Sequence, residues 1–273
     1  MAFAGNPLFI NTVLLGGTPR QKLQAAHDAG FDQVELWQQD VSAADSDCEG
    51  LRDLLTDLPL GLTDYQVLLD FDGAPEPLRQ QKYDEARSMI ETAVKLGATT
   101  LLVPASTDDR CQFERAEEDL RWLTEQAQRK GLRVAYEAMA WSSKIHTTAD
   151  AWQLVKRIDA PNLGLVVDAF HIFVRQRSIT DLAGIPAEKI YLVQLSDLAE
   201  LPQDGKLVET ARHHRLLPGE GQFPLTSLLD HLRAIDYRGP LGLEVFNDGL
   251  QHANPAATAK KAMRALRQQL ARF

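Results

Sequence analysis

The chain has 273 residues, a formal net charge of −9, 44% hydrophobic residues and 25% charged residues. This is the composition of a soluble globular protein, and an acidic balance without a basic run argues against nucleic acid or an anionic membrane as a partner. With only two cysteines, no basic segment before the first apolar stretch and no apolar run of about 20 residues, we expect a cytoplasmic protein without a disulfide framework.

Strand and helix patterns alternate along the whole chain. Short apolar runs predict strands at 9–15, 31–37, 60–69, 99–106, 133–139, 163–171, 190–197 and 239–246. Amphipathic patterns predict helices at 18–30, 50–58, 83–97, 114–131, 148–158, 178–185, 224–235 and 256–270, of which 178–185 is the shortest. Eight such units without a linker predict a single-domain α/β protein over residues 1–273. We expect a (β/α)8 (TIM) barrel with its active site at the C-terminal ends of the strands.

Each of the last four predicted strands carries one oxygen ligand near its C-terminal end: Glu137, Asp168, Gln194 and Glu244. A carboxylate in a buried strand is costly unless a cation neutralises it. Oxygen-only ligands suit Mg2+ or Mn2+, and also accommodate Co2+, whereas zinc more often recruits His or Cys. The four residues therefore predict one divalent metal ion at the mouth of the barrel. The alternative for each is a strand-end cap or an ion-pair partner.

Two further side chains are candidates for proton transfer. His171 lies three residues after Asp168 and can turn back toward the metal; histidine exchanges protons near neutral pH. Glu35, at the end of the second predicted strand, is a candidate acid, base or substrate acceptor, with a structural ion pair as the alternative. Trp37, Trp141 and Phe246 are expected to wall the pocket or to belong to the core.

A basic stretch follows the seventh predicted strand and contains Arg212, His213 and Arg215. Arginine can bind a carboxylate through two parallel hydrogen bonds, so this stretch is the candidate binding site for an anionic substrate. A solvated basic loop is the alternative.

Together these residues resemble the xylose isomerase-like barrel superfamily of sugar isomerases, epimerases and dehydratases. Within it, the chain most resembles the 3-dehydroshikimate dehydratases of quinate and shikimate catabolism. The matching stretches are YEAMAW (136–141), DAFH (168–171), YLVQLSD (191–197), ARHHRLLPGEG (211–221) and LGLEVFND (241–248). Gln194 discriminates, because sugar epimerases of the superfamily usually carry His there.

The resemblance implies dehydration of 3-dehydroshikimate, an anionic cyclic hydroxyketone, to protocatechuate through a metal-stabilised enolate. It implies that the four oxygen ligands bind the metal, that His171 is the acid/base, acting as base in its neutral form, and that Arg215 with Arg212 or His213 contacts substrate. Leu69 stands where the family commonly has Arg, so one substrate anchor is expected to differ. Larger relatives carry a second, dioxygenase-like domain, which we do not expect here.

Two other functions remain open. A ketose epimerase, a sugar isomerase or an inosose dehydratase would use the same metal site, with Glu137 and Glu244 as proton carriers. A metal-free barrel that binds a metabolite without turnover is the third reading, and it predicts no stoichiometric metal. A homo-oligomer is compatible with the sequence.

Overall fold

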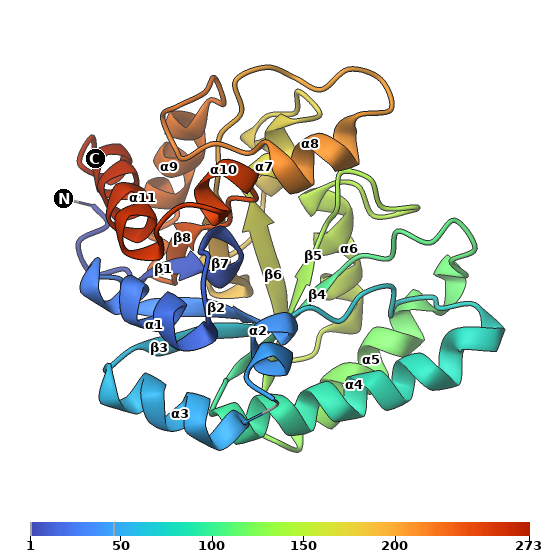
Figure 1. Cartoon of the computed structure of the whole chain (residues 1–273). Coiled ribbons are helices and arrows are strands. Elements are labelled where there is room, and N and C mark those ends of the chain that lie inside the picture. Colours follow the sequence, from blue (N-terminus) through green and yellow to red (C-terminus); the bar gives the residue numbers. More distant parts are fainter. Residues whose placement is uncertain (1, 46) are drawn as a thin grey trace.

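In the computed structural model, which describes residues 2–45 and 47–273, eight parallel strands close into a barrel in chain order (Figure 1). The strands are β1 (Leu8–Asn11), β2 (Gln33–Trp37), β3 (Gly61–Gln66), β4 (Thr100–Pro104), β5 (Arg133–Glu137), β6 (Leu163–Asp168), β7 (Ile190–Leu195) and β8 (Leu241–Leu243). The barrel closes where β8 pairs with β1, with Leu241 opposite Leu8 and Leu243 opposite Ile10. The predicted (β/α)8 barrel is therefore confirmed.

Helices surround the barrel and continue the chain between strands (Figure 1). They are α1 (Pro19–Asp28), α2 (Gln38–Ala43), α3 (Cys48–Asp57), α4 (Glu76–Leu96), α5 (Ala116–Gln128), α6 (Thr148–Ile158), α7 (Ala169–Phe173), α8 (Leu207–His213), α9 (Leu225–Ala234), α10 (Asp248–Gln251) and α11 (Pro255–Leu270). The start of α1 follows from its sequence. Thr18 accepts a hydrogen bond from the N–H of Gln21, whose side chain bonds back to Thr18, and Pro19 occupies the first turn.

Local side-chain hydrogen bonds explain most of the differences from the predicted elements. The strand predicted over 9–15 ends at Asn11, because its side chain accepts from the N–H of Val13 and caps a short 3-10 helix. The strand predicted over 163–171 ends at Asp168 for the same reason, since Asp168 caps α7. The helix predicted over 178–185 is only a 3-10 helix over Ile179–Leu182. Helices α2, α8 and α10 were not predicted, and α4 begins before the predicted 83–97.

An apolar layer fills the barrel interior below the strand ends. It includes Phe9, Leu102, Ala135, Val166 and Leu192, all at most 1% exposed. Gly242 leaves room for it, because a Cβ there would meet the carbonyl oxygen of Phe9 at 2.2 Å. Side chains alternate along a strand, so the residue two positions after each layer member also points inward, nearer the C-terminal ends. That next level is polar and holds Asn11, Glu137, Asp168, Gln194 and Glu244.

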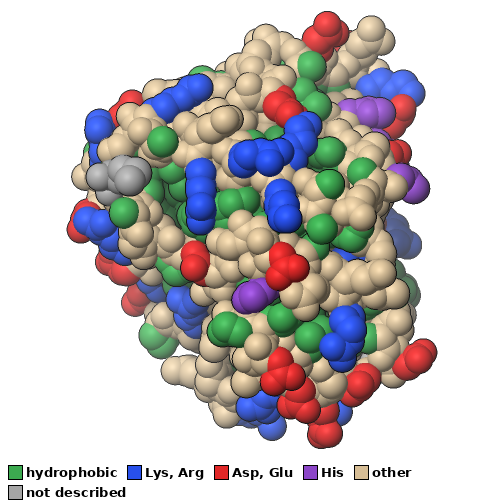
Figure 2. All heavy atoms as spheres, turned by 60° about the vertical axis from the view of Figure 1, so that its left-hand side comes forward, with side chains coloured by type: hydrophobic (Ala, Val, Ile, Leu, Met, Phe, Trp, Pro, Cys, Tyr) green, Lys and Arg blue, Asp and Glu red, His purple; other side chains and the backbone are tan. Residues whose placement is uncertain are grey.

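The outer surface mixes charges of both signs. On the side where α1 and α11 lie, acidic and basic side chains are interspersed, with a few basic ones grouped near the middle of the view (Figure 2). Among the described helices, none combines the length and the apolar character needed to cross a membrane.

Candidate metal centre and active site

The four predicted oxygen ligands converge at the mouth of the barrel. Glu137 ends β5, Asp168 ends β6, Gln194 lies in β7, and Glu244 directly follows β8. All four are buried, with exposed fractions between 0 and 6%. Nε2 of Gln194 lies 3.3 Å from Oε1 of Glu244, and Nε2 of His171 lies 3.6 Å from both Oε1 of Glu137 and Oδ2 of Asp168. One ligand atom each from Glu137, Asp168 and His171 lies within 4.8 Å of the other two.

These residues fit a divalent cation. Oε1 of Glu137 and Oε1 of Gln194 are buried and have no hydrogen-bond partner in the described structure, a costly state that coordination to a metal would relieve. Burial, together with the carboxylates of Glu244 and Asp168, raises the pKa of Glu137 well above its usual range. Burial also raises the pKa of Glu244 to about 8, although Arg215 opposes that shift. A divalent cation would reverse both shifts by favouring the ionised carboxylates.

His171 is held in one orientation by the backbone. The N–H of Ala140 donates to Nδ1 of His171 over 3.1 Å, and the ring of Trp141 packs edge-on with centroids 4.9 Å apart. Because Nδ1 accepts, the proton of the neutral ring lies on Nε2, which faces Glu137 and Asp168. Burial lowers the pKa of His171 to about 4, so the ring is neutral at pH 7.

This arrangement changes the expected role of His171. A neutral base needs a free lone pair at the cavity, whereas Nε2 of His171 presents a proton there. The ring is therefore placed to donate a hydrogen bond or a proton, and a lone pair for metal coordination is likewise absent from Nε2. From the sequence we expected His171 to act first as the base. Its contact with Ala140 favours the role of a donor instead.

Arg215 lies inside the ligand set, 2% exposed. Its Nη1 donates to Oδ2 of Asp168 over 2.9 Å and to Oε2 of Glu244 over 3.2 Å, and its Nε donates to the carbonyl of Ala211. Its guanidinium carbon stacks 4.3 Å from the ring centroid of Phe170. Arg215 thus balances two buried carboxylates, which leaves less of its donor capacity for substrate than the sequence suggested.

The other two basic candidates lie further out. Arg212 and His213 are both exposed residues of α8. Arg212 lines the cavity above the metal ligands, but Nδ1 of His213 lies 3.0 Å from Oδ1 of Asp248 and His213 is not among the cavity residues. The structure therefore brings Arg212, but not His213, to the cavity.

The cavity at this end of the barrel has a volume of about 350 Å3. Its lining combines an apolar wall with a few polar groups: Trp37, Gln39, Gln66, Val67, Leu69, Pro104, Glu137, Met139, Trp141, His171, Ala211, Arg212, Arg215, Glu244 and Phe246. The three predicted aromatics are all among them, and Trp37 meets Phe246 edge-on with centroids 5.7 Å apart. Leu69, at 42% exposed, stands at the rim. The volume suits one small, partly apolar metabolite.

Glu35 lies below this cavity. It is fully buried in β2, it is not part of the lining, and its Oε1 accepts a hydrogen bond from Nε2 of Gln194 over 2.8 Å. Its neighbour Asp64, directly opposite it in β3, is equally buried. Glu35 therefore reaches a proposed metal ligand and not the space where substrate would bind.

Comparison with known proteins adds the family. A family model described as xylose isomerase-like TIM barrel matches residues 23–269. The chain belongs to this family. This xylose isomerase-like barrel is 38% identical over 259 residues to a 3-dehydroshikimate dehydratase of Pseudomonas aeruginosa, covering 94% of the chain and 40% of that relative. The chain thus spans well under half the length of this relative.

Two other comparisons bear on the barrel. A solved structure described as a xylose isomerase-like TIM barrel/4-hydroxyphenylpyruvate dioxygenase fusion protein superposes with a TM-score of 0.92 at 33% identity, covering 98% of the chain and 44% of that protein. An inosose isomerase of Bacillus velezensis is 25% identical over 263 residues, covering 92% of the chain and 91% of that relative. The chain is thus similar to one part of a longer fusion protein and also to nearly the whole of a second relative.

Sequence analysis missed two residues of the centre of this xylose isomerase-like barrel. Asn11 in β1 donates from Nδ2 to Oε1 of Glu244 over 3.0 Å, and Asp64 in β3 lies directly opposite Glu35. The sequence did point to both residues, because each lies at an inward position of a predicted strand. Their partners are distant in sequence, however, so only the closed barrel reveals the contacts.

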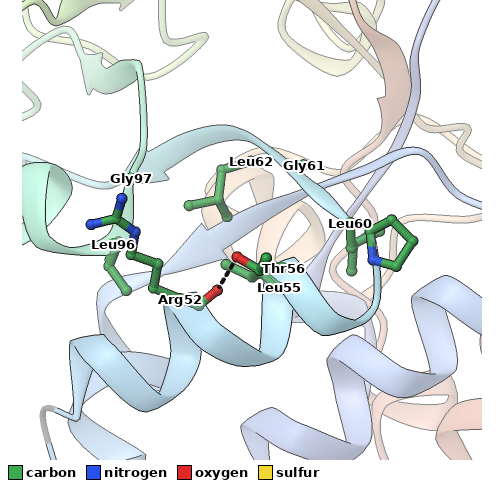
Figure 3. A pocket seen from close by; sticks show the side chains of 9 residues that line it. Arg52, Leu55, Thr56, Leu60, Gly61, Leu62, Leu96 and Gly97 are labelled. Carbon is green, nitrogen blue, oxygen red and sulfur yellow. Dashed lines mark hydrogen bonds between the residues drawn. The ribbon is translucent and has the colours of Figure 1, made fainter.

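A second depression lies at the opposite end of the barrel, where β3 begins at Gly61 (Figure 3). Its one charged lining residue is Arg52, and the hydroxyl of Thr56 already donates to the carbonyl of Arg52. Its lining contains no carboxylate, histidine or cysteine, so the candidate metal centre of the xylose isomerase-like barrel is the better candidate site.

Proposed function

We propose that this chain catalyses the metal-dependent dehydration of 3-dehydroshikimate to protocatechuate. The observation that carries the proposal is the pair of unpartnered buried oxygens, on Glu137 and Gln194, among carboxylates at the cavity floor. The identity of 38% with a 3-dehydroshikimate dehydratase over 94% of the chain supports the choice of reaction.

The proposed cation would be held by the four oxygen ligands Glu137, Asp168, Gln194 and Glu244. When bound, it would supply Lewis-acid stabilisation of the negative charge that develops on the substrate's ketone oxygen. We propose Mg2+ or Mn2+, with Co2+ as a substitute, because hard cations prefer oxygen ligands. The two free cysteines, Cys48 and Cys111, fit the reducing cytoplasm that we propose as the compartment.

The chain offers a hydrogen-bond donor and a proton acceptor at the cavity. Nε2 of His171 carries a proton and lies 3.6 Å from Oε1 of Glu137. With Oε1 on the cation, the second carboxylate oxygen of Glu137, which lines the cavity, would be the proton acceptor. Dehydration removes a proton from the carbon next to the ketone and expels the β-hydroxyl as water. We propose that the carboxylate of Glu137 takes the proton from carbon and passes it to the departing hydroxyl, which leaves as water, while the N–H of the neutral His171 ring donates a hydrogen bond to that hydroxyl. Transfer of a further ring proton to the ketone oxygen completes the aromatic ring and makes the reaction effectively irreversible.

The substrate's carboxylate would meet Arg212 at the rim. Arg215 has two carboxylate partners already, so Arg212 is the cavity arginine with more donors to offer. The apolar wall formed by Trp37, Trp141 and Phe246 would pack against the ring and exclude water from the reacting carbon.

An ultraviolet assay tests the proposal directly. Purified protein is mixed with 3-dehydroshikimate and Mg2+, Mn2+ or Co2+, and the absorbance of protocatechuate is followed beside an EDTA-treated control. Metal-dependent aromatic product is the expected result. No product with any of the three metals would reject the dehydratase proposal.

The second candidate is isomerisation of an inosose or a ketose. It is favoured by the inosose isomerase of B. velezensis, since the match covers 91% of that relative. The same carboxylate set would serve, with Glu137 and Glu244 as proton carriers. Chromatography of a panel of inososes and ketoses after incubation with the protein distinguishes the two, because isomerisation yields an isomer of equal mass and no aromatic product.

A further inference from the structure

Glu35 is a fully buried acid near the cavity that has no place in the proposed reaction. It is 0% exposed, sits in β2 opposite Asp64 of β3, and is separated from the cavity lining. Burying an acid completely is costly, so its retention here calls for a role. Its contacts indicate what the acid does.

The principal contact is with Gln194 of β7, which lies 159 positions further along the chain. Nε2 of Gln194 donates to Oε1 of Glu35 over 2.8 Å and to Oε1 of Glu244 over 3.3 Å. Both partners are carboxyl oxygens, so the nitrogen of the amide must face them. A flipped amide would set its carbonyl oxygen against two acceptors and lose both hydrogen bonds. Oε1 of Gln194 is consequently the atom left free, and it is buried without a partner in the described structure.

Glu35 is itself held in place from the other side. Asp64 of β3 stands directly opposite Glu35, and Oδ1 of Asp64 accepts from Nε2 of Gln66 over 3.2 Å. These residues come from neighbouring strands, so the backbone of the barrel fixes the chain of contacts. The carboxyl of Glu35 is thus a rigid support beneath one proposed ligand.

We propose that Glu35 is a positioning residue that orients the side-chain amide of Gln194 so that its carbonyl oxygen faces the divalent cation. The inference rests on the proposed metal centre. An amide is the one ligand type in this set with two chemically different ends, so it alone needs such an orienting partner. Outer partners of metal ligands typically change metal affinity by about 10- to 100-fold when they are removed.

Mn2+ binding to the purified protein is the test, with the free ion measured from its electron paramagnetic resonance signal. Glu35→Leu removes the acceptor at similar volume and should weaken Mn2+ binding by about 10-fold or more. Glu35→Gln keeps an acceptor oxygen and should stay within about threefold of the wild type. Equal affinity of Glu35→Leu and the wild type would overturn the positioning role.

A second background separates positioning from general damage. In Gln194→Ala the amide is gone, so adding Glu35→Leu should change the Mn2+ dissociation constant by less than about twofold. An equal loss in both backgrounds would show that Glu35 acts on the fold and not through Gln194. Failure of the wild type to bind Mn2+ would overturn the metal centre as well, which distinguishes the two failures.

An exchanged pair keeps the test valid if Glu35→Leu does not fold. Gln194→Glu alone sets two carboxyls against each other. The double variant Glu35→Gln/Gln194→Glu restores a donor–acceptor pair of reversed polarity with nearly unchanged shape. We expect the double variant to bind Mn2+ at least about fivefold more tightly than Gln194→Glu. Equal affinities would contradict the proposal.

Discussion

The backbone N–H of Ala140 donates to Nδ1 of His171 over 3.1 Å, and this one contact fixes which ring nitrogen carries the proton. The proton lies on Nε2, at the cavity and 3.6 Å from Oε1 of Glu137. A protonated ring would have donors at both nitrogens, and one of them would face the N–H of Ala140. His171 is therefore held as a neutral donor.

Replacing His171 tests its role as a donor to the departing hydroxyl. His171→Ala should lower kcat by about 10²- to 10³-fold, the range for a lost hydrogen-bond donor to developing charge, while metal content measured by mass spectrometry stays unchanged. His213→Ala is the matched control, since His213 is exposed and pairs with Asp248 outside the cavity. Activity of His171→Ala within a few-fold of the wild type would assign this donor role elsewhere.

Glu137→Gln should stabilise the metal-free protein and weaken its binding of Mn2+. In metal-free protein the carboxylates of Glu244 and Asp168 oppose ionisation of Glu137, so an amide at this position should raise the melting temperature by a few degrees. Mn2+ affinity should fall at least about 10-fold because a charged ligand is lost. Melting curves with and without EDTA measure both effects. Glu188→Gln, at an exposed position, should change neither.

Arg215→Met should destabilise the protein by about 3–5 kcal/mol, because it leaves the buried carboxylates of Asp168 and Glu244 without their cation. Urea unfolding measures the loss. Arg238 is the matched control: it pairs with Asp236 on the surface, so Arg238→Met should stay within about 0.5 kcal/mol. Similar small losses for both variants would contradict the balancing role given to Arg215.

Arg212→Ala should raise KM for a carboxylate-bearing substrate about 10-fold with little change in kcat, since Arg212 would bind substrate and transition state alike. Steady-state kinetics of Arg212→Ala and His213→Ala, neighbours in α8, decide whether the cavity position matters. An unchanged KM in Arg212→Ala would leave the substrate carboxylate to Arg215.

Asp72 should make stability depend on pH. Burial raises the pKa of Asp72 to about 7, although hydrogen bonds from the Tyr136 hydroxyl and the Ser106 N–H oppose the shift. Between the ordinary pKa of 3.8 and about 7, the folded state binds a proton that the unfolded state does not, so the free energy of unfolding falls as pH rises. The change amounts to about 4 kcal/mol across that window.

Comparison with Asp72→Asn isolates this contribution, because the variant shares every other titrating group. Unfolding in urea at pH 5 and pH 8 should show the wild type losing about 3 kcal/mol relative to Asp72→Asn on going to pH 8, because about two pH units of the window lie above pH 5. Parallel behaviour of the two proteins would show that Asp72 ionises normally.

The strands and the proposed ligand positions could be predicted from the sequence because one periodicity governs both. Glu137, Asp168 and Gln194 each lie two residues after an apolar inward residue, so local alternation places them at the mouth. The contact of Gln194 with Glu35 joins residues 159 positions apart, and no local pattern encodes it. The roles of Glu35, Arg215 and His213 depend on such contacts, and the expectations for them from sequence were correspondingly less specific.

The seam of the barrel, where β8 meets β1, passes through the candidate metal centre. Asn11 of β1 donates a hydrogen bond to Glu244, just after β8, and Gln194 of β7 donates one to Glu35 of β2. These polar contacts therefore join the first strands of the chain to the last. A chain in which these strands have not yet met has no such centre. The moment at which the refolding chain begins to bind Mn2+ would therefore report when the barrel closes. Circular permutants join the original termini and place the new termini between two other strands. They should bind Mn2+ only if β1 still pairs with β8.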